Sequence, residues 1–348
     1  MRFAVTAEQR QFGAALHGLL ADADVAAAAR AWATGDHEPG LAIWRELAKL
    51  GVTALTVPES FGGLGAEPVD LVVACEELGH HPLPGPIAES IAAVPHVLTT
   101  VATAGSAGAT GSAAGLAADW LAALASGDLV ATLALPPLLP YALDADAAGL
   151  VLLADGTALW QATPQARLES ADRARRLFEV RPDQPLAPWA DTEPALRQAA
   201  GYGTLASAAL LLGAGRGLLE ASTGYAKTRE QFGRPVGAFQ AVKHALADTA
   251  IGLEFARPLL YAAAIALGAG ATSTARDISA ARVACAQAAR HAARVALQVH
   301  GAIGYTLECD ISLWLAKIRS LSCTWGSQSE HRAVVLAALG QDGAGPWN

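Results

Sequence analysis

Tyr225-Ala-Lys-Thr-Arg-Glu-Gln-Phe-Gly-Arg-Pro-Val-Gly-Ala-Phe-Gln240 lies between two long apolar runs with the composition of helices. Its centre, residues 229–239, combines glycines, a proline and charges, which is typical of a break between helices. The arginine at 229 is a planar fork of donors that suits a phosphate group, and the phenylalanine at 232 can lie against an aromatic ring system. The stretch therefore predicts a junction between two helices that carries a candidate anion-binding site.

A second stretch of this kind, Gln298-Val-His-Gly-Ala-Ile-Gly-Tyr-Thr306, follows further along the chain. Its first residue and Gln240 each offer an amide donor and acceptor, as a ribose or an adenine edge requires. Gly301 and Gly304, with the small Ala302 between them, allow backbone N–H groups to approach an anion. We expect the two stretches to face one ligand.

Working outward from these stretches, apolar residues recur at helical spacing through most of the chain. In the C-terminal part helices are expected at 196–227, 241–268, 274–299 and 311–338, which predicts a four-helix bundle. In the N-terminal part helices are expected at 6–33, 41–50, 68–78 and 87–125, with a loop at 103–115. Both ends of the chain are therefore predicted to be helical.

The middle of the chain has a different character. Short apolar runs bounded by proline, aspartate and glycine predict strands at 129–135, 150–160 and 177–180, and Pro182–Pro188 is expected to be a loop. The predicted fold is α+β and mainly α, in three domains. They are an N-terminal helical domain (1–126), a small and shortened β-domain (127–195) and a C-terminal four-helix bundle (196–348).

Two local features have both a structural and a functional interpretation. The glycines of residues 213–217 fall inside a predicted helix, and tight helix packing is favoured over contact with a ligand because no phosphate-loop spacing is present. The adjacent histidines His80 and His81 would point apart on most backbones, so a place on a surface loop is favoured over a metal site. No metal site is predicted.

Composition restricts the class of protein. The chain has 348 residues, is 53% hydrophobic and only 16% charged, so it can form a large ordered core. Its net charge of −8 argues against sequence-independent binding of nucleic acid. The four cysteines form no CxxC pair and are interpreted as buried free thiols in a reducing compartment. With no secretory signal visible and apolar runs short of the ~20 residues of a membrane span, a cytoplasmic protein that does not cross a membrane is expected.

The two opening stretches resemble the signature segments of acyl-CoA dehydrogenases, on Thr228–His244 and Gln298–Thr306. Leu50–Gly65 and Glu76–Gly79 resemble the N-terminal domain of the same family, so the resemblance covers nearly the whole chain in order. It implies FAD as cofactor and α,β-desaturation of an acyl-CoA thioester. In this family a glutamate removes the α-proton while the hydride of the β-carbon passes to the flavin, and each flavin is shared between two subunits.

By this resemblance one subunit holds the flavin ring and the neighbouring subunit holds its ADP half. The residues that match the ADP-binding half are Arg229, Phe232, Gln240, Gln298, Gly301, Ala302 and Gly304. Ala302 stands where the family usually has a second glycine.

The other half of the family's site is missing from this sequence. Of the two positions at which relatives carry the catalytic glutamate, one is Trp325 and the other is Gly203. Tryptophan cannot accept a proton. The segment Thr132–Pro140 also lacks the Ser-Asp pair with which the family holds the flavin. No catalytic residue is therefore assigned to this chain.

This contrast leads to the hypothesis of a hetero-oligomer. The chain resembles the non-catalytic subunit of bacterial heteromeric acyl-CoA dehydrogenases of steroid degradation, which implies a catalytic partner subunit and two copies of each chain. Two alternatives stay open. One is an autonomous dehydrogenase with a displaced base, for which Glu230, Glu308 and Asp310 are the candidates. The other is a flavin-free binding or scaffold protein that kept the fold. The sequence does not reveal the acyl group.

Overall fold

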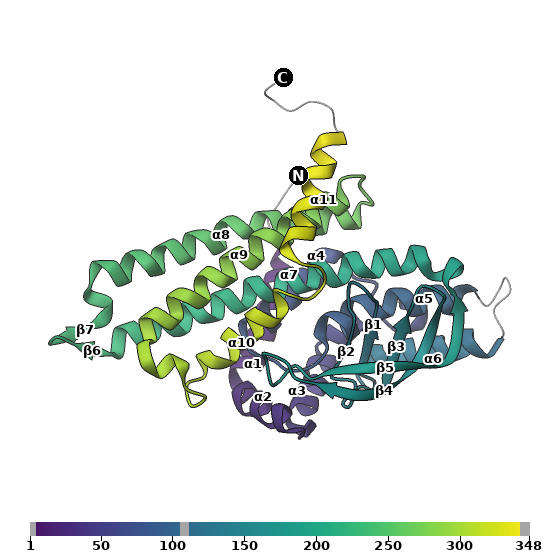
Figure 1. Cartoon of the computed structure of the whole chain (residues 1–348), viewed down its shortest axis with the longest axis horizontal. Helices are drawn as coiled ribbons and strands as arrows, with labels where there is room; N and C mark the ends of the chain where they lie inside the picture. The colour runs from purple at the N-terminus through teal and green to yellow at the C-terminus, as the bar shows by residue number, and fades with distance from the viewer. Residues whose placement is uncertain (1–4, 105–110, 342–348) are drawn as a thin grey trace.

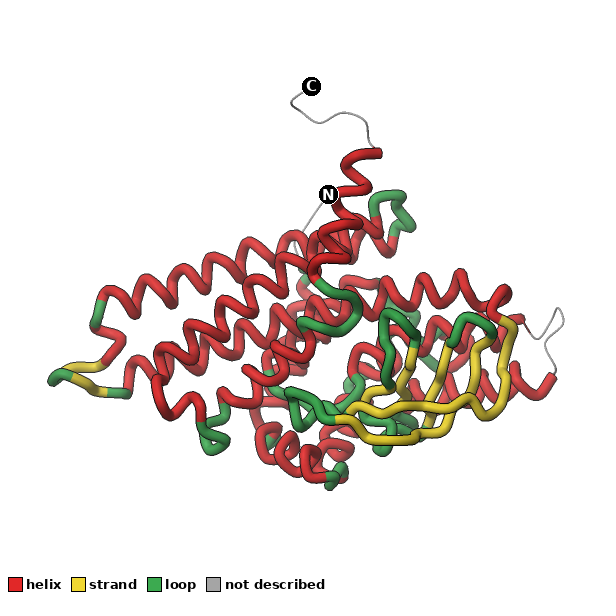
Figure 2. The backbone as a smooth tube through the Cα atoms, in the orientation of Figure 1, coloured by secondary structure: helices red, strands yellow, loops and turns green. Residues whose placement is uncertain are grey.

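The computed structural model describes residues 5–104 and 111–341. Figure 1 shows helices of the N-terminal part below the middle of the molecule, a small sheet at one end and long helices that extend to the other end. Figure 2 shows that the strands are confined to that sheet and to a short hairpin at the opposite tip. The structure is mainly helical with a small sheet, as predicted.

The N-terminal helices begin at clear signals. α1 (Ala7–Asp22) starts with a capping box, in which the Gln9 backbone N–H donates to Thr6 Oγ1 at 3.2 Å and the Thr6 N–H donates to Gln9 Oε1 at 3.0 Å. The helix expected at 6–33 is in fact two helices, bent by 66° between α1 and α2 (Val25–Thr34). Asp24 caps the second helix through its side chain, which explains the break.

The remaining N-terminal elements follow in chain order. They are α3 (Glu38–Lys49), η1 (Val52–Ala54), η2 (Glu59–Phe61), α4 (Pro68–His80), η3 (Ala88–Ala93), α5 (Val94–Ala104) and α6 (Gly111–Ser126). η3 is a π-helical segment, an irregularity that is common near functional sites. Of the loop expected at 103–115, residues 105–110 lie outside the described residues, while 103–104 belong to α5 and 111–115 to α6, so in its described part the expectation is wrong.

The sheet has five strands in the order β1-β3-β4-β5-β2. Its strands are β1 (Ala131–Ala134), β2 (Ala142–Leu143), β3 (Leu150–Ala154), β4 (Ala158–Leu168) and β5 (Leu177–Pro188). β1 and β3 are parallel, and the β3–β4, β4–β5 and β5–β2 pairs are antiparallel. Figure 1 places α5 and α6 beside this sheet.

Two expectations for the sheet are wrong. The run 150–160 is not one strand but the end of β3, a turn at Asp155–Thr157 and the start of β4. Residues 182–188 continue β5 although three prolines interrupt them, so they are not a loop. β2 pairs only with Leu177 and Phe178, which leaves the rest of β5 as an edge where proline needs no donor.

The C-terminal helices form the elongated part of the molecule. They are α7 (Trp189–Thr228), α8 (Gln240–Gly268), α9 (Thr274–His300), α10 (Ile311–Leu321) and α11 (Gln328–Gln341), with the hairpin strands β6 (Glu230–Gln231) and β7 (Arg234–Pro235) and the turns η4 (Val236–Ala238) and η5 (Gly301–Tyr305) between them. The helix expected at 311–338 is interrupted by residues 322–327. Trp325 lies in this interruption.

Glycines let α7 pack closely against α4. A Cβ at Gly213 would lie 1.9 Å from the carbonyl oxygen of Glu76, and one at Gly217 would lie 2.3 Å from that of His80. Such distances exclude any side chain unless the backbones move apart. Helix packing, the favoured interpretation of the 213–217 glycines, is therefore confirmed.

The expectation that every apolar run is too short to cross a membrane is wrong for one helix. Among the described residues α8 is the single helix that is long and apolar enough to cross a membrane, and 39% of its most apolar window is buried. Its inner face packs on α7 and α9. Its outer face exposes Ile251, Phe255 and Leu259 at helical spacing. An exposed apolar stripe of this kind is typical of a contact surface as well as of a membrane span.

Candidate functional site

The two stretches that the sequence singles out lie side by side. The ring of Tyr225, at the end of α7, stacks on the ring of His300, at the end of α9, with centroids 4.3 Å apart and an angle of 22° between the rings. The β6–β7 hairpin forms the tip of the molecule beyond them (Figure 1). The two stretches are therefore neighbours in the fold, and that they face one ligand stays a prediction.

Phe232 lies at the turn of this hairpin and is 91% exposed. Its backbone has φ +54°, a conformation that non-glycine residues rarely adopt. Its ring makes only an edge contact with Phe239, with centroids 6.1 Å apart, and the Arg234 guanidinium lies 4.2 Å from the centre of the Phe239 ring. A phenylalanine held this far out of the core is available to a ring system brought by another molecule.

The polar residues of this surface are also exposed. Arg229 ends α7, and its backbone is fixed because its N–H donates to the Tyr225 carbonyl at 2.8 Å and its carbonyl accepts from Val236 N–H at 2.8 Å. Within residues 5–104 and 111–341 its guanidinium forms no ion pair. Gln240 is the first residue of α8, Gln298 lies in the last turn of α9, and both are exposed.

The turn between α9 and α10 needs glycine at two positions. Gly301 has φ +64°, and a Cβ at the buried Gly304 would press on Ile311 at 3.0 Å and Leu297 at 3.1 Å. Ala302 is exposed in the same turn, so its methyl group disturbs no internal packing. We refer to Arg229, Phe232, Gln240, Gln298, Gly301, Ala302 and Gly304 together as the tip surface. It offers a cation, an aromatic face and two amides, which are the kinds of group that the ADP half of FAD would need, whereas the Gly301 N–H is already used by the Leu297 carbonyl.

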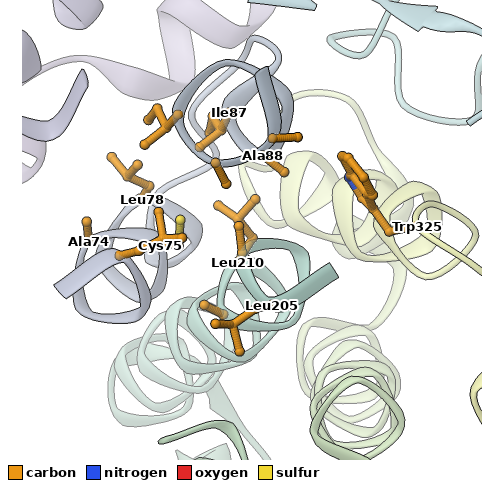
Figure 3. Packing of buried hydrophobic residues seen from close by; sticks show 14 of the residues in the cluster. Ala74, Cys75, Leu78, Ile87, Ala88, Leu205, Leu210 and Trp325 are labelled. Atoms are coloured by element: carbon orange, nitrogen blue, oxygen red, sulfur yellow. The ribbon is translucent and has the colours of Figure 1, made fainter. Parts of the chain in front are cut away.

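The two positions where relatives carry the catalytic glutamate contact each other. Trp325 is fully buried, and a Cβ at Gly203 would lie 2.3 Å from its indole ring. Trp325 belongs to the buried cluster that also contains Ala88 and Leu210 (Figure 3). The indole therefore fills the space that a side chain at residue 203 would need, and neither position offers a carboxylate.

Side chains of Arg282 and His331 hold the loop that carries Trp325 through its backbone carbonyl groups. The buried Arg282 guanidinium donates to the carbonyl oxygens of Leu321 and Thr324, at 2.5 and 2.9 Å. A nitrogen of the His331 ring lies 2.8 Å from the carbonyl oxygen of Trp325. Trp325 itself has φ +57°. Burial lowers the pKa of Arg282 to about 10, so it stays charged and can hold both carbonyl groups.

Little space remains beside Trp325. The cavity there has a volume of about 20 Å³ and is lined by residues of η3, α7, α10 and the sheet, Trp325 and Glu89 among them. That is room for about one water molecule, whereas sites for small ligands are usually several hundred Å³. The structure does not leave room for an acyl thioester at this place, and the residues here do not fit the ring half of a flavin site.

Glu89 is a buried carboxyl that sequence reasoning missed. It lies in η3, is 2% exposed and lines the same small cavity. Burial raises the pKa of Glu89, while the Arg175 guanidinium and the indole of Trp325 act in the opposite direction. No described residue makes a hydrogen bond of normal geometry with the indole N–H. The signal that could have revealed Glu89 is a lone carboxylate in the apolar run of residues 87–98.

The carboxylates that the sequence offers as displaced bases lie elsewhere. Glu230, Glu308 and Asp310 are exposed, and none lines the cavity beside Trp325. Asp310 pairs with Arg30 at 2.5 Å. Thr132, in the strand where the family binds its flavin, is buried, and its hydroxyl accepts an internal hydrogen bond from Leu143 N–H at 3.1 Å.

Two further expectations need correction. Of the four free cysteines only Cys75 and Cys285 are buried, while Cys323 is exposed. His80 is not on a surface loop: it is the last residue of α4, it is buried, and its ring lies 5.0 Å from that of His81. The error has a local cause. The helix ends between the two histidines, and the extended backbone of His81 turns both rings toward the same place.

Comparison with known proteins agrees with this geometry. Residues 6–128 match the acyl-CoA dehydrogenase N-terminal domain, and residues 195–340 match the acyl-CoA dehydrogenase C-terminal domain. The acyl-CoA dehydrogenase IpdE2 of Mycobacterium tuberculosis is 31% identical over 296 residues, which are 84% of this chain and 84% of that protein.

Solved structures show the same fold. The Tcur3481–Tcur3483 steroid acyl-CoA dehydrogenase, as its G363A variant, superposes with a TM-score of 0.80 at 23% identity over 97% of this chain and 99% of that one. The ChsE4–ChsE5 complex from Mycobacterium tuberculosis superposes with a TM-score of 0.77 at 20% identity over 99% of this chain and 100% of that one.

Proposed function

The chain belongs to the acyl-CoA dehydrogenase family, and on that premise we propose that it is the non-catalytic subunit of a heteromeric, FAD-dependent acyl-CoA dehydrogenase. Its tip surface would hold the ADP half of the FAD whose ring and substrate sit in a catalytic partner subunit. The observation that carries the proposal is Trp325, which seals this chain's own base position against Gly203.

The place of the tip surface supports a site shared between chains. Figure 1 has the β6–β7 hairpin at one end of the molecule and the five-stranded sheet at the other. In this family the sheet side of a subunit contacts the flavin ring. A tip surface at the far end cannot reach a flavin held by its own sheet, so its ligand must come from a neighbouring chain.

Because Trp325 occupies the place of the catalytic base, the neighbouring chain has to be of a different kind. A second copy of this chain would again present Trp325, Gly203 and a cavity of about 20 Å³ where the ring and thioester belong. A partner with an intact glutamate and an open pocket completes the site. Similarity to a steroid acyl-CoA dehydrogenase and to a two-protein complex supports such a partner and a steroid-derived acyl-CoA as substrate, and we propose two copies of each chain in the assembly.

Four side chains of the tip surface have a definite task in this proposal. The Arg229 guanidinium would hold the pyrophosphate. Phe232 would lie against an aromatic face, and the amides of Gln240 and Gln298 would bind hydroxyl or ring-edge groups. FAD, when bound, would supply the acceptor for the hydride of the β-carbon, and a carboxylate of the partner would take the α-proton. This chain supplies position and charge but no proton acceptor.

Co-purification of the chain with the partner tests the proposal, with bound flavin and acyl-CoA oxidation as readouts. Arg229→Ala should weaken flavin binding by the complex about 30-fold, because a charge-assisted contact of about 2 kcal/mol is lost. Arg197→Ala is the matched control, an exposed arginine on the same helix far from the tip, and it should change nothing. Stoichiometric FAD and turnover by this chain alone would refute the proposal.

The autonomous enzyme keeps one observation in its favour, the buried Glu89 beside Trp325. Its raised pKa suits a general base, but the cavity that it faces holds about one water rather than a substrate. Activity of the isolated chain that disappears in Glu89→Gln would favour this alternative. A complex without flavin would favour a scaffold protein instead.

A further inference from the structure

Three histidine rings meet where α1, the end of α4 and α7 come together. One ring nitrogen each of His17, His80 and His81 lies within 4.8 Å of the other two. The ring centroids are 5.0 to 5.3 Å apart in all three pairs. His17 comes from the middle of α1, far away in sequence, which is why the chain order gave no sign of the cluster.

Carboxylates orient two of the three rings. Glu77 Oε2 lies 3.1 Å from Nδ1 of His17, and Glu220 Oε2 lies 3.0 Å from Nε2 of His80. A carboxylate that accepts from one ring N–H fixes the tautomer in which the other nitrogen keeps its lone pair. This arrangement of carboxylate and imidazole is the usual support of a histidine that ligates a metal.

Two nitrogens of the cluster have no partner. Nδ1 of the buried His80 and Nε2 of His81 are both shielded from solvent and make no hydrogen bond with any described residue. Buried polar atoms without a partner are rare and call for a ligand.

The surroundings are preorganised and accessible. The His80 carbonyl accepts from Trp314 Nε1 at 2.9 Å and packs on Gly217, which fixes the end of α4. An open cavity of about 610 Å³ leads from solvent to His17, His80, Glu77 and Glu220. Arg216 also lines it, but Glu76 and Glu77 neutralise its guanidinium at 2.8 and 3.0 Å.

We propose that His17, His80 and His81 form a binding site for a divalent ion of the zinc class, supported by Glu77 and Glu220. Tetrahedral Zn–N bonds of about 2.0 to 2.1 Å put the nitrogens about 3.3 Å apart, so the rings need to close by about 1.5 Å or less. His17, whose side chain is 42% exposed, is free to make that movement. The ion would tie α1 and α4 to α7 and leave a fourth position for water.

The test is a Co²⁺ titration of the untagged full chain after removal of metals by a chelator, alone or with its partner. The wild type should bind one ion per chain with the visible absorption of nitrogen-coordinated Co²⁺, and Zn²⁺ should displace it and raise the melting temperature. His17→Gln and His81→Gln should each weaken binding at least tenfold. His244→Gln, an exposed histidine on α8, is the control and should bind as the wild type does.

Two outcomes would overturn the proposal. One is binding of less than one ion per chain, and the other is equal affinity of the wild type and both cluster variants. Circular dichroism of the metal-free variants confirms that they fold, so a loss of binding can be assigned to the ligands. The readouts need no flavin, so they stand apart from the test of the proposed function.

Discussion

Trp325 and Phe232 are both aromatic residues in a backbone conformation that usually requires glycine, with φ +57° and +54°. Their surroundings are opposite. Trp325 is 0% exposed and fills the position of the missing base, whereas Phe232 is 91% exposed at the hairpin tip. The same local strain therefore accompanies a buried ring in one region and an exposed ring in the other.

The supports of the two residues explain the difference. Arg282 and His331 fix the loop of Trp325 through its backbone carbonyl groups, and Gly203 makes space for the indole. Phe232 has only an edge contact with Phe239. A rigid, dry contact stabilises this chain by itself. Burial of the exposed Phe232 ring can stabilise only a complex in which another molecule covers it. The two regions therefore differ in what they stabilise: Trp325 the fold of this chain, and Phe232 a contact with another molecule.

The largest effect that distinguishes the two regions should come from Trp325→Ala. Removal of a fully buried indole leaves a cavity and should lower the free energy of unfolding by about 3–5 kcal/mol. Denaturant unfolding measures it. Phe232→Ala should change the free energy of unfolding of the isolated chain by less than about 0.5 kcal/mol, because its ring is exposed. An equal loss in both variants would contradict the difference between the two regions.

Asp144 is the third non-glycine residue with positive φ among those described, at +50°, and it is fully buried like Trp325. Burial raises its pKa to about 7, against hydrogen bonds from Arg176 N–H and Trp32 Nε1–H that lower it. Between about pH 4 and 7 the folded chain then holds a proton that the unfolded chain has lost, so this group makes stability fall as pH rises.

Asp144→Asn should remove that dependence. The difference in unfolding free energy, variant minus wild type, should rise between pH 4 and 7 by at most about 1.4 kcal/mol per pH unit. Unfolding curves at several pH values measure it. A difference that stays constant over this range would show that Asp144 is ionised in the fold.

Gly203→Ala tests the contact between the two empty base positions. Its Cβ would lie 2.3 Å from the indole of Trp325, so the variant should lose about 1–3 kcal/mol of stability. Gly224→Ala, on the same helix with open space around it, should instead gain about 0.5–1 kcal/mol. In a Trp325→Ala background the cost of Gly203→Ala should largely disappear, and full additivity would contradict the contact.

Phe232→Ala should have the smallest effect and only in the complex. The loss of one aromatic contact of about 1 kcal/mol should weaken flavin binding about fivefold. Flavin fluorescence of the assembled complex measures this change. Phe255→Ala removes another exposed ring, on the outer face of α8, and should leave flavin affinity unaltered. If both variants weaken flavin alike, the effect belongs to assembly and not to the tip surface.

Much of the fold could be predicted because its signals are local. Helical periodicity and the run of glycines, prolines and charges at 229–239 placed the helices of the C-terminal part and the break between two of them, whereas the hairpin in that break was not predicted. The prediction was wrong where neighbours decide the outcome. The prolines of 182–188 are tolerated because β2 leaves that part of β5 unpaired, and the helix at 311–338 is broken where Arg282 captures the carbonyl groups of the loop.

The sequence by itself determined the family, the helical architecture and the absence of a carboxylate at Trp325 and Gly203, since these depend on residue identity and order. Only the tertiary structure decided that these two residues touch, that Glu89 is buried beside them, and that His17 joins His80 and His81. Each of these contacts joins segments far apart in the chain. These contacts depend on how the helices pack across the core, and the spacing of residues along the sequence does not reveal that packing.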